Sequence, residues 1–177
     1  MFLLKPKISS IIKEPADTLL LTPPILKQLL DNRAPVILCI GTDRIIGDSL
    51  GPLVGSMLLK ENCKGLPVYG TLSAPVHALN LDSVLKEIHK RHPEHIIIAV
   101  DASLGEHSDI GSVYVRSGSL QPGAGVSKTL SSAGDISITG VAAPQSRQPY
   151  LALQTTRLST VAAMAQSICG CILCACT

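Results

Sequence analysis

Residues 35–58, PVILCIGTDRIIGDSLGPLVGSML, carry the strongest fold signal in the chain. The first six residues form a continuous apolar run rich in β-branched side chains, which is typical of a strand buried on both faces of a parallel sheet. The turn that follows contains Gly41 and Gly47, and glycine permits tight turns with close backbone approach. The next apolar residues recur at helical spacing, at Leu50, Leu53, Val54, Met57 and Leu58. The stretch therefore predicts a buried strand, a tight turn and a helix.

Strands and helices continue to alternate along the chain. Runs rich in β-forming residues predict further strands at 66–72, in 95–105 with its end at Asp101, and at 135–143, and the alternating stretch 109–118 predicts a more exposed strand. Helices are predicted at 22–32 and 75–92, with one long closing helix from Pro149 to about Cys169. Residues 1–21 are a predicted lead-in segment, and residues 119–134 a loop rich in Gly, Ser and Pro. This order indicates an α/β sandwich with a mostly parallel sheet, and residues 1–177 are predicted to form a single domain.

Composition excludes several classes of protein. Apolar residues make up 46% of the chain and charged residues 16%, which is not the composition of a disordered protein. The net charge is only +2 and the basic residues are scattered, so we expect no nucleic-acid partner. Aromatic residues are scarce, with one Phe, three Tyr and no Trp, which also argues against a protein that stacks single-stranded bases.

The six cysteines and the C-terminal segment predict a reducing, non-membrane environment. No signal peptide is apparent, so the thiols are expected to be free in the cytoplasm. Residues 161–176, VAAMAQSICGCILCAC, are apolar but shorter than the roughly 20 strongly apolar residues of a membrane span. We expect the end of a buried helix and then a loose Cys-rich tail at 170–177. Cys171 and Cys174 lack a second ligand pair at a usual zinc spacing.

Acidic side chains follow the predicted strands at one edge of the sheet. In open α/β sheets ligands bind outside the carboxyl ends of strands, and this edge holds Asp43, Asp48 and Asp101, the last predicted to end its strand. A carboxyl group in such apolar surroundings has a raised pKa unless it is partnered. Structural roles remain open at each position. Ser49 and Asp48 are the candidate N-caps of the helix that follows, and Asp43 is a candidate turn residue paired with Arg44. Asp101 is a candidate N-cap for the turn DASLG or a partner for a backbone amide.

The turn after the first strand is not a phosphate-binding loop. It lacks both the Gly-Lys-Ser/Thr ending of a P-loop and the G-x-G-x-x-G pattern. Two carboxyl groups that meet cannot both ionise easily, and such a pair can hold and activate a water molecule. His77, in the turn after the second predicted strand, opens the helix at 75–92 and faces the same edge. It is a candidate ligand or general base, with an ordinary surface histidine as the alternative.

Several motifs together resemble one known family. They are CIGTDRIIGDSLGPLVG, VYGTLSAPVHALNL, IIIAVDASLG, PGAGVSK, GDISITGV and LQTTRLS. Over about residues 35–165 they resemble the YyaC family of sporulation proteins, which is similar to the germination protease of small acid-soluble spore proteins. More distantly they are similar to the HybD-type hydrogenase maturation endopeptidases. The resemblance implies a three-layer α/β/α sandwich.

The resemblance also implies a site. The positions that match the acidic residues of the germination protease are Asp48 and Asp101, which are the expected catalytic pair. In the hydrogenase-type peptidases the same two places and a histidine in a later loop bind nickel. The corresponding stretch here, SKTLSSAGD, has no histidine, so no metal is expected. His77, within PVHALNL, is the candidate third group. Glycine-rich segments are expected to line the cleft and donate backbone hydrogen bonds, with Gly41, Thr42, Asp43, Gly47, Gly123 and Gly125 as the lining residues.

The resulting hypothesis is a sporulation-associated endopeptidase that uses an aspartate pair to activate water. Its expected partner is a protein or peptide substrate, with small spore proteins as candidates, and its expected location is the cytoplasm of the forespore or spore of a spore-forming bacterium. Two alternatives stay open: a non-catalytic sporulation or germination protein that uses the fold for binding, and a metal-dependent hydrolase with His77 as ligand. A homo-oligomer also stays open.

Overall fold

A computed structural model describes residues 18–61, 65–122 and 131–176. The elements follow in the order β1 (Leu19–Leu20), α1 (Pro23–Leu30), β2 (Pro35–Cys39), the short 3-10 helix η1 (Gly47–Ser49), α2 (Leu50–Lys60), β3 (Val68–Tyr69), α3 (Leu81–Arg91), β4 (Ile96–Gly105), the 3-10 helix η2 (His107–Asp109), β5 (Val113–Ser117), β6 (Ile136–Pro144), α4 (Pro149–Gln154) and α5 (Leu158–Cys176).

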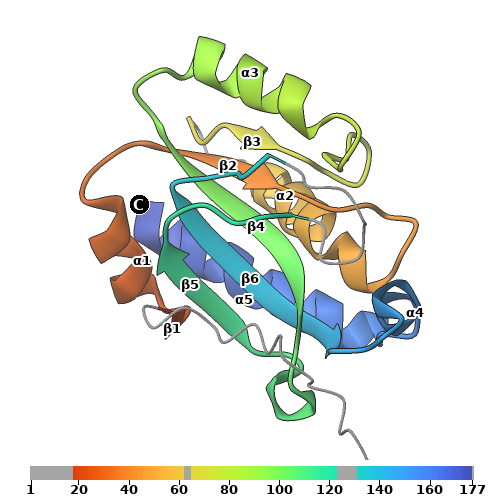
Figure 1. Cartoon of the computed structure of the whole chain (residues 1–177). Coiled ribbons are helices and arrows are strands. Elements are labelled where there is room, and N and C mark those ends of the chain that lie inside the picture. The colour runs from red at the N-terminus through yellow and green to blue at the C-terminus, as the bar shows by residue number, and fades with distance from the viewer. Residues whose placement is uncertain (1–17, 62–64, 123–130, 177) are drawn as a thin grey trace, which may run out of the picture.

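The strands form one six-stranded sheet in the order β1-β5-β6-β4-β2-β3 (Figure 1). The four strands β3, β2, β4 and β6 are parallel to their neighbours. At the other edge β5 is antiparallel to β6, and β1 is antiparallel to β5. The predicted α/β fold with a mostly parallel sheet is confirmed.

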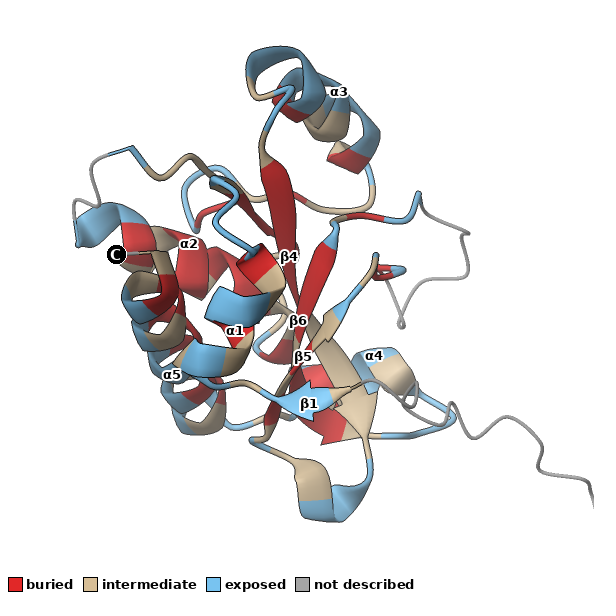
Figure 2. Ribbon diagram, turned by 90° about the vertical axis from the view of Figure 1, so that its left-hand side faces the viewer, coloured by how far each residue is buried: buried red, intermediate tan, exposed pale blue. Residues whose placement is uncertain are grey.

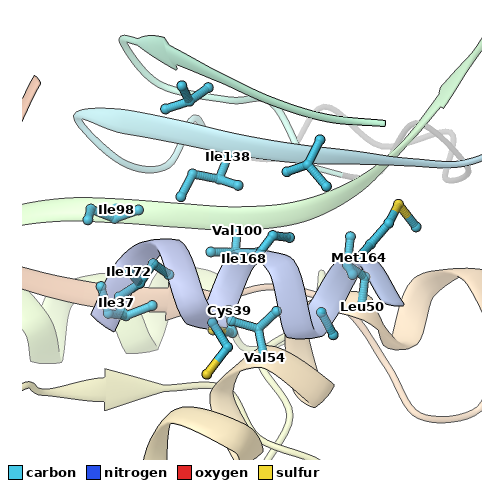
Figure 3. Close-up of a cluster of buried hydrophobic side chains, with 14 of the residues drawn as sticks. Ile37, Cys39, Leu50, Val54, Ile98, Val100, Ile138, Met164, Ile168 and Ile172 are labelled. Carbon is cyan, nitrogen blue, oxygen red and sulfur yellow. The ribbon is translucent and has the colours of Figure 1, made fainter. Parts of the chain in front are cut away.

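Helices cover both faces of the sheet, which confirms the three-layer arrangement. Alternate residues of a strand point to opposite faces, so Ile98 and Val100 of β4 enter one core while Ile97 and Ala99 enter the other. The larger core lies between the sheet and helices α1, α2 and α5 (Figure 2), and Figure 3 shows its side chains around α5. The smaller core lies under α3, whose apolar contribution includes Leu81 and Ile88.

Both ends of the described chain are more ordered than the sequence predicted. Part of the expected lead-in forms β1, which pairs with β5 through Leu19 and Leu20. The expectation of a loose tail after Cys169 is wrong, because α5 runs on to Cys176. Its buried face continues through Ile172 and Ala175 into the larger core.

By length and composition alone α5 would also suffice to cross a membrane. In this structure its buried residues recur at helical spacing along one side and pack in the larger core, against α1 and α2. These residues are Val161, Met164, Ala165, Ile168, Cys169, Ile172 and Ala175. This pattern is that of a core helix in an α/β sandwich.

The predicted long closing helix is wrong, because it divides into α4 and α5 with a break at Thr155–Arg157. The Thr155 hydroxyl donates to the carbonyl oxygen of Leu151, at 3.0 Å, and the Thr156 hydroxyl lies within hydrogen-bond distance of the carbonyl oxygens of Ala142 and Ala152. Threonine side chains that bond to nearby carbonyl groups compete with helix continuation. The break directs α4 away from the axis of α5.

Candidate functional site

A cavity of about 450 Å³ opens beyond the carboxyl end of β2. Its walls come from the chain that leaves β2, the turn that follows β3, the second half of β4, and α4. Asp48, His77 and Asp101 all line this cavity. The fold therefore brings together three of the residues that the sequence singled out, from segments more than twenty residues apart.

Asp48 lies in η1 and is partly buried. The main-chain N–H of Thr42 donates to Asp48 Oδ2, at 3.0 Å, and to the Asp48 carbonyl oxygen, at 3.1 Å. These bonds hold residue 42 of the turn against Asp48. Burial raises the pKa of Asp48 above its ordinary value, while the Thr42 hydrogen bond and the charge of His77 act to lower it. The net effect favours the protonated carboxyl group more than in water.

The alternative that Asp48 caps the following helix is wrong. Ser49 occupies the N-cap position of α2, and no side chain caps that helix. The Ser49 hydroxyl donates instead to the carbonyl oxygen of Ile46, at 2.6 Å. The second oxygen of the Asp48 carboxyl group, Oδ1, is therefore not committed to α2.

Asp101 is buried, with 7% of its surface exposed, and lies on β4 opposite Thr139 of β6. The expectation that Asp101 ends its strand is wrong, because β4 continues beside β6 to Gly105. Its Oδ1 accepts the main-chain N–H of Ala102, at 2.9 Å. Asp101 thus has the predicted structural role of accepting a backbone amide, and it also lines the cavity.

His77 lies in a turn before α3, not within a helix as predicted, because α3 begins at Leu81. Asn80 holds this turn: its Oδ1 accepts the His77 main-chain N–H, at 2.8 Å, and its Nδ2 donates to the carbonyl oxygen of Pro75, at 3.0 Å. The Leu79 main-chain N–H donates to His77 Nδ1, at 3.3 Å. In a neutral imidazole this bond leaves the proton on Nε2, which is then a hydrogen-bond donor.

The glycine-containing turn depends on one close approach. Gly41 has a φ of +140°, and a Cβ atom there would lie 2.0 Å from the carbonyl oxygen of Asp48. Gly41, Thr42 and Asp43 line the cavity as expected from the sequence. Gly47 instead lies behind the lining, where a Cβ atom would meet Leu153 of α4 at 2.7 Å. Gly123 and Gly125 lie outside the described residues.

Asp43 and Arg44 are exposed at the mouth of the cavity, and no ion pair joins them within the described ranges. The ion pair that the described ranges contain joins Arg91 and Glu87 of α3, away from the cavity lining. The expected pairing of Asp43 with Arg44 is therefore wrong, and Arg44 does not neutralise Asp48. Both charged side chains remain available to solvent at the entrance.

Across residues 18–61, 65–122 and 131–176, no three His, Cys, Asp or Glu side chains are grouped so that they could hold a metal ion. One oxygen of Asp48, one of Asp101 and the Nδ1 atom of His77 already accept backbone N–H groups. These three hydrogen bonds hold the side chains of Asp48, Asp101 and His77 against the neighbouring backbone.

Sequence reasoning missed the apolar part of the lining. It comes from Ile45, Leu79, Leu104, Tyr150 and Leu153, in four separate segments. Leu79 is 86% exposed and Tyr150 is 53% exposed. The pair Thr155-Thr156 was a signal for the helix break that places Tyr150 and Leu153, but no local pattern connects these residues to Asp48.

Residues 11–171 match the protein family described as "Protein of unknown function (DUF1256)". The chain belongs to this family. It is 48% identical over 130 residues to "Uncharacterized protein YyaC" of Bacillus subtilis (strain 168), in an alignment that covers 73% of this chain and 63% of that protein. The chain thus spans less than two thirds of the length of this relative.

The fold of this member of the family is similar to a solved structure, a [NiFe] hydrogenase maturation protease HycI from Thermococcus kodakarensis KOD1. The TM-score is 0.57 with 18% sequence identity, and the match covers 86% of this chain and 98% of that chain. At this identity the likeness shows the α/β fold and not the activity.

Proposed function

We propose that the protein is an endopeptidase in which Asp48 and Asp101 activate water to hydrolyse a peptide bond. The observation that carries the proposal is that both aspartates and His77, from three separate segments, line one cavity at the carboxyl ends of parallel strands. Ligand sites of open α/β sheets occur at this edge. The peptidase-like fold supports the same reaction class.

The two carboxyl groups have different roles in this proposal. In this proposal Asp48, whose pKa is raised by burial, is the protonated member, and Asp101, whose Oδ1 accepts the Ala102 N–H, is the ionised member. Asp101 takes a proton from water as the water oxygen bonds to the peptide carbonyl carbon, and Asp48 gives its proton to the carbonyl oxygen. The C–N bond then breaks as Asp101 returns its proton to the leaving amine, and a hydroxyl of the intermediate returns a proton to Asp48. No covalent enzyme intermediate forms.

His77 and the glycine turn assist this reaction. The Nε2–H group of His77 is a donor for developing negative charge, and its charged form stabilises the ionised form of Asp48. Gly41 allows the close contact between its own turn and Asp48 that holds this carboxyl group in place. No cofactor enters the proposed reaction.

Substrate and location follow from the resemblance to sporulation proteins and are part of the proposal. The substrate is a protein or peptide, with small acid-soluble spore proteins as the first candidates, and the site of action is the cytoplasm of the forespore or spore.

The test compares cleavage of small acid-soluble spore proteins by the wild type, Asp48→Asn and Asp101→Asn. Each variant should lose about 100-fold or more of the cleavage rate, because general acid–base groups contribute on that scale. Mass spectrometry of the products measures the rate, and circular dichroism checks the fold. Asp82→Asn, an exposed change on α3, is the control and should cleave as the wild type does. Equal cleavage by all four proteins, or no cleavage by the wild type, contradicts the proposal.

A non-catalytic binding module is the second candidate function. The observation that favours it is that both aspartates already accept backbone N–H groups, from Thr42 and Ala102, so each also has a structural role. Under this alternative the wild type binds spore proteins without cutting them.

If the protein is instead a metal-dependent hydrolase, cleavage should stop with a chelator and return with added Ni²⁺ or Zn²⁺. If the aspartate pair carries the reaction, a chelator should leave the cleavage rate unchanged.

A further inference from the structure

Strand β4 is longer than its neighbour β2, and its second half forms an open edge beside the cavity. The paired residues of β2 and β4 end at Cys39 and Val100, and the last hydrogen bond runs from the Ile40 N–H to the Val100 carbonyl oxygen, at 2.8 Å. The chain then leaves β4, because the Gly41 N–H bonds to the carbonyl oxygen of Val76, at 2.8 Å. Figure 1 shows β4 continuing past the end of β2 with β6 still at its side.

We define residues 102–105 of β4 as the β4 overhang. In a strand, the N–H and C=O groups of successive residues point to alternate neighbours. Ile96 and Val100 bond to the chain on the β2 side, through Ala34 and Ile40, whereas Ile97 and Gly105 accept bonds on the β6 side. By this alternation the main-chain groups of Ala102 and Leu104 point toward the open edge.

The open edge carries main-chain groups of β4 that are directed away from β6. The Ala102 N–H is used by Asp101 Oδ1, at 2.9 Å. Among the described residues, no hydrogen bond from a turn, loop or cap reaches the carbonyl oxygens of Ala102 and Leu104 or the N–H of Leu104, and the alternation along β4 directs these three groups away from β6. Both residues are half-buried and line the cavity. Backbone polar groups in such a place are normally paired, so the edge is complementary to another extended chain.

We propose that the β4 overhang binds the substrate as an added β-strand, in the place that β2 leaves free after Ile40. This inference rests on the proposed function and names its substrate class: an extended, unstructured peptide segment. Its backbone pairs with Ala102 and Leu104, next to Asp101 in the same strand. Main-chain pairing of this kind supplies affinity largely independent of sequence, and pockets for alternate side chains supply specificity.

The apolar part of the lining predicts which side chains the segment carries. Side chains of an extended peptide alternate between the two faces of the sheet to which it is added. Those on one face meet the apolar groups of Leu79, Tyr150 and Leu153, of which Leu79 and Tyr150 are exposed. The preferred segments therefore carry apolar residues at alternate positions.

The first test uses short fluorescein-labelled peptides with apolar residues at alternate positions, and the Asp48→Asn variant so that cleavage does not intervene. Fluorescence anisotropy measures Kd. For the peptide that binds most tightly, each backbone amide is N-methylated in turn. Methylation of one alternate set should weaken binding about tenfold or more per position, because a main-chain hydrogen bond is lost, and methylation of the other set should not. Equal sensitivity at all positions, or no peptide with Kd below about 1 mM, overturns the inference.

The second test is on the protein. Leu104→Pro removes the N–H group from the open edge and leaves the β6 ladder intact, while Leu104→Ala removes the side chain and keeps the N–H. Binding should weaken about tenfold or more with Leu104→Pro relative to Leu104→Ala. If Leu104→Pro does not fold, amide hydrogen exchange of the full-length Asp48→Asn protein decides: peptide should slow exchange at Leu104 and leave Ser103, which faces β6, unchanged. Unchanged exchange at Leu104 overturns the inference.

The two proposals fail separately. Alternating sensitivity to N-methylation without any cleavage by the wild type keeps the added strand and overturns the endopeptidase. Cleavage that depends on Asp48 and Asp101 but shows no alternation keeps the endopeptidase and overturns the added strand.

Discussion

The site depends on residues whose individual environments are unfavourable for stability. Asp48 is a carboxyl group partly buried beside apolar side chains, and burial raises its pKa despite the hydrogen bond from Thr42. Such a group costs free energy when it ionises, and costs of this kind are common where a protein performs chemistry. Replacing Asp48 therefore tests whether its ionisation costs the folded protein free energy.

Asp48→Asn should make the protein more stable than the wild type at neutral pH. Because the folded-state pKa of Asp48 is raised above its ordinary value of 3.8, the native state binds this proton more tightly than the unfolded state. The free energy of unfolding of the wild type then falls as pH rises from about 3.8 through the raised pKa, and the variant lacks this fall. Urea denaturation at a series of pH values across this range measures the free energy of unfolding of the wild type and of the variant. Asp82→Asn is the exposed control, and a constant difference between wild type and Asp48→Asn at all pH values would contradict this assignment.

Gly41→Ala should destabilise the fold by about 2–4 kcal/mol, since both the positive φ and the Asp48 carbonyl oxygen oppose a Cβ atom there. Gly170 is the matched control: it lies exposed in α5, and a Cβ atom added there would meet no neighbouring side chain within 4 Å. Gly170→Ala should stabilise by about 0.5–1 kcal/mol through helix propensity. Thermal and urea unfolding of both variants measure the effects, and equal behaviour of the two would refute the close approach at Gly41.

At the scale of elements, the C-terminal helix determines how the larger core is closed. The segment after Cys169 is small and Cys-rich, yet Ile172 is fully buried against the sheet (Figure 3). The helix break at Thr155–Arg157 in turn sets α4 over the cavity, where Tyr150 and Leu153 line it. One segment of sequence thus serves the core at one end and the candidate site at the other.

Ile172→Ala should cost about 2–5 kcal/mol, the range for removing a large aliphatic side chain from a packed core. Gln166→Ala, an exposed change on the same helix, should change stability by less than about 0.5 kcal/mol. The free energy of unfolding from urea titration separates the two. Similar small effects for both would show that the end of α5 does not pack on the sheet.

At the scale of the whole molecule, one sheet supports two cores. Strands β2 and β4 contribute alternate residues to the core under α3 and to the core under α1, α2 and α5 (Figure 2). A strand cannot lose its order on one face alone, so the two cores are coupled through the backbone they share. The single domain predicted from chain length is testable on this basis.

Ile88→Ala, in the core under α3, and Ile168→Ala, in the larger core, should each lower the midpoint of one common unfolding transition. Each change should cost about 2–5 kcal/mol without altering the dependence on urea concentration. Fluorescence of the tyrosines and circular dichroism should report the same curve. Two transitions, of which each variant shifts only one, would show that the cores unfold independently.

Local sequence patterns were sufficient to predict the class of fold and most of the strands. Continuous apolar runs at 35–40 and 96–100 are typical of strands covered on both faces, and the family motifs marked Asp48, Asp101 and His77 as residues of interest. These signals are local, because hydrophobic period, turn residues and short motifs are all properties of a few neighbouring residues.

The surroundings of those residues, in contrast, depend on the tertiary structure. The length of β4 beyond Asp101 depends on pairing with β6, and the position of α4 depends on hydrogen bonds from Thr155 and Thr156 to carbonyl groups, one of them in β6. The apolar lining of the cavity and its open strand edge come from segments far apart in the chain. No window of sequence contains these contacts, because they form only when the sheet order brings β2, β4 and β6 side by side.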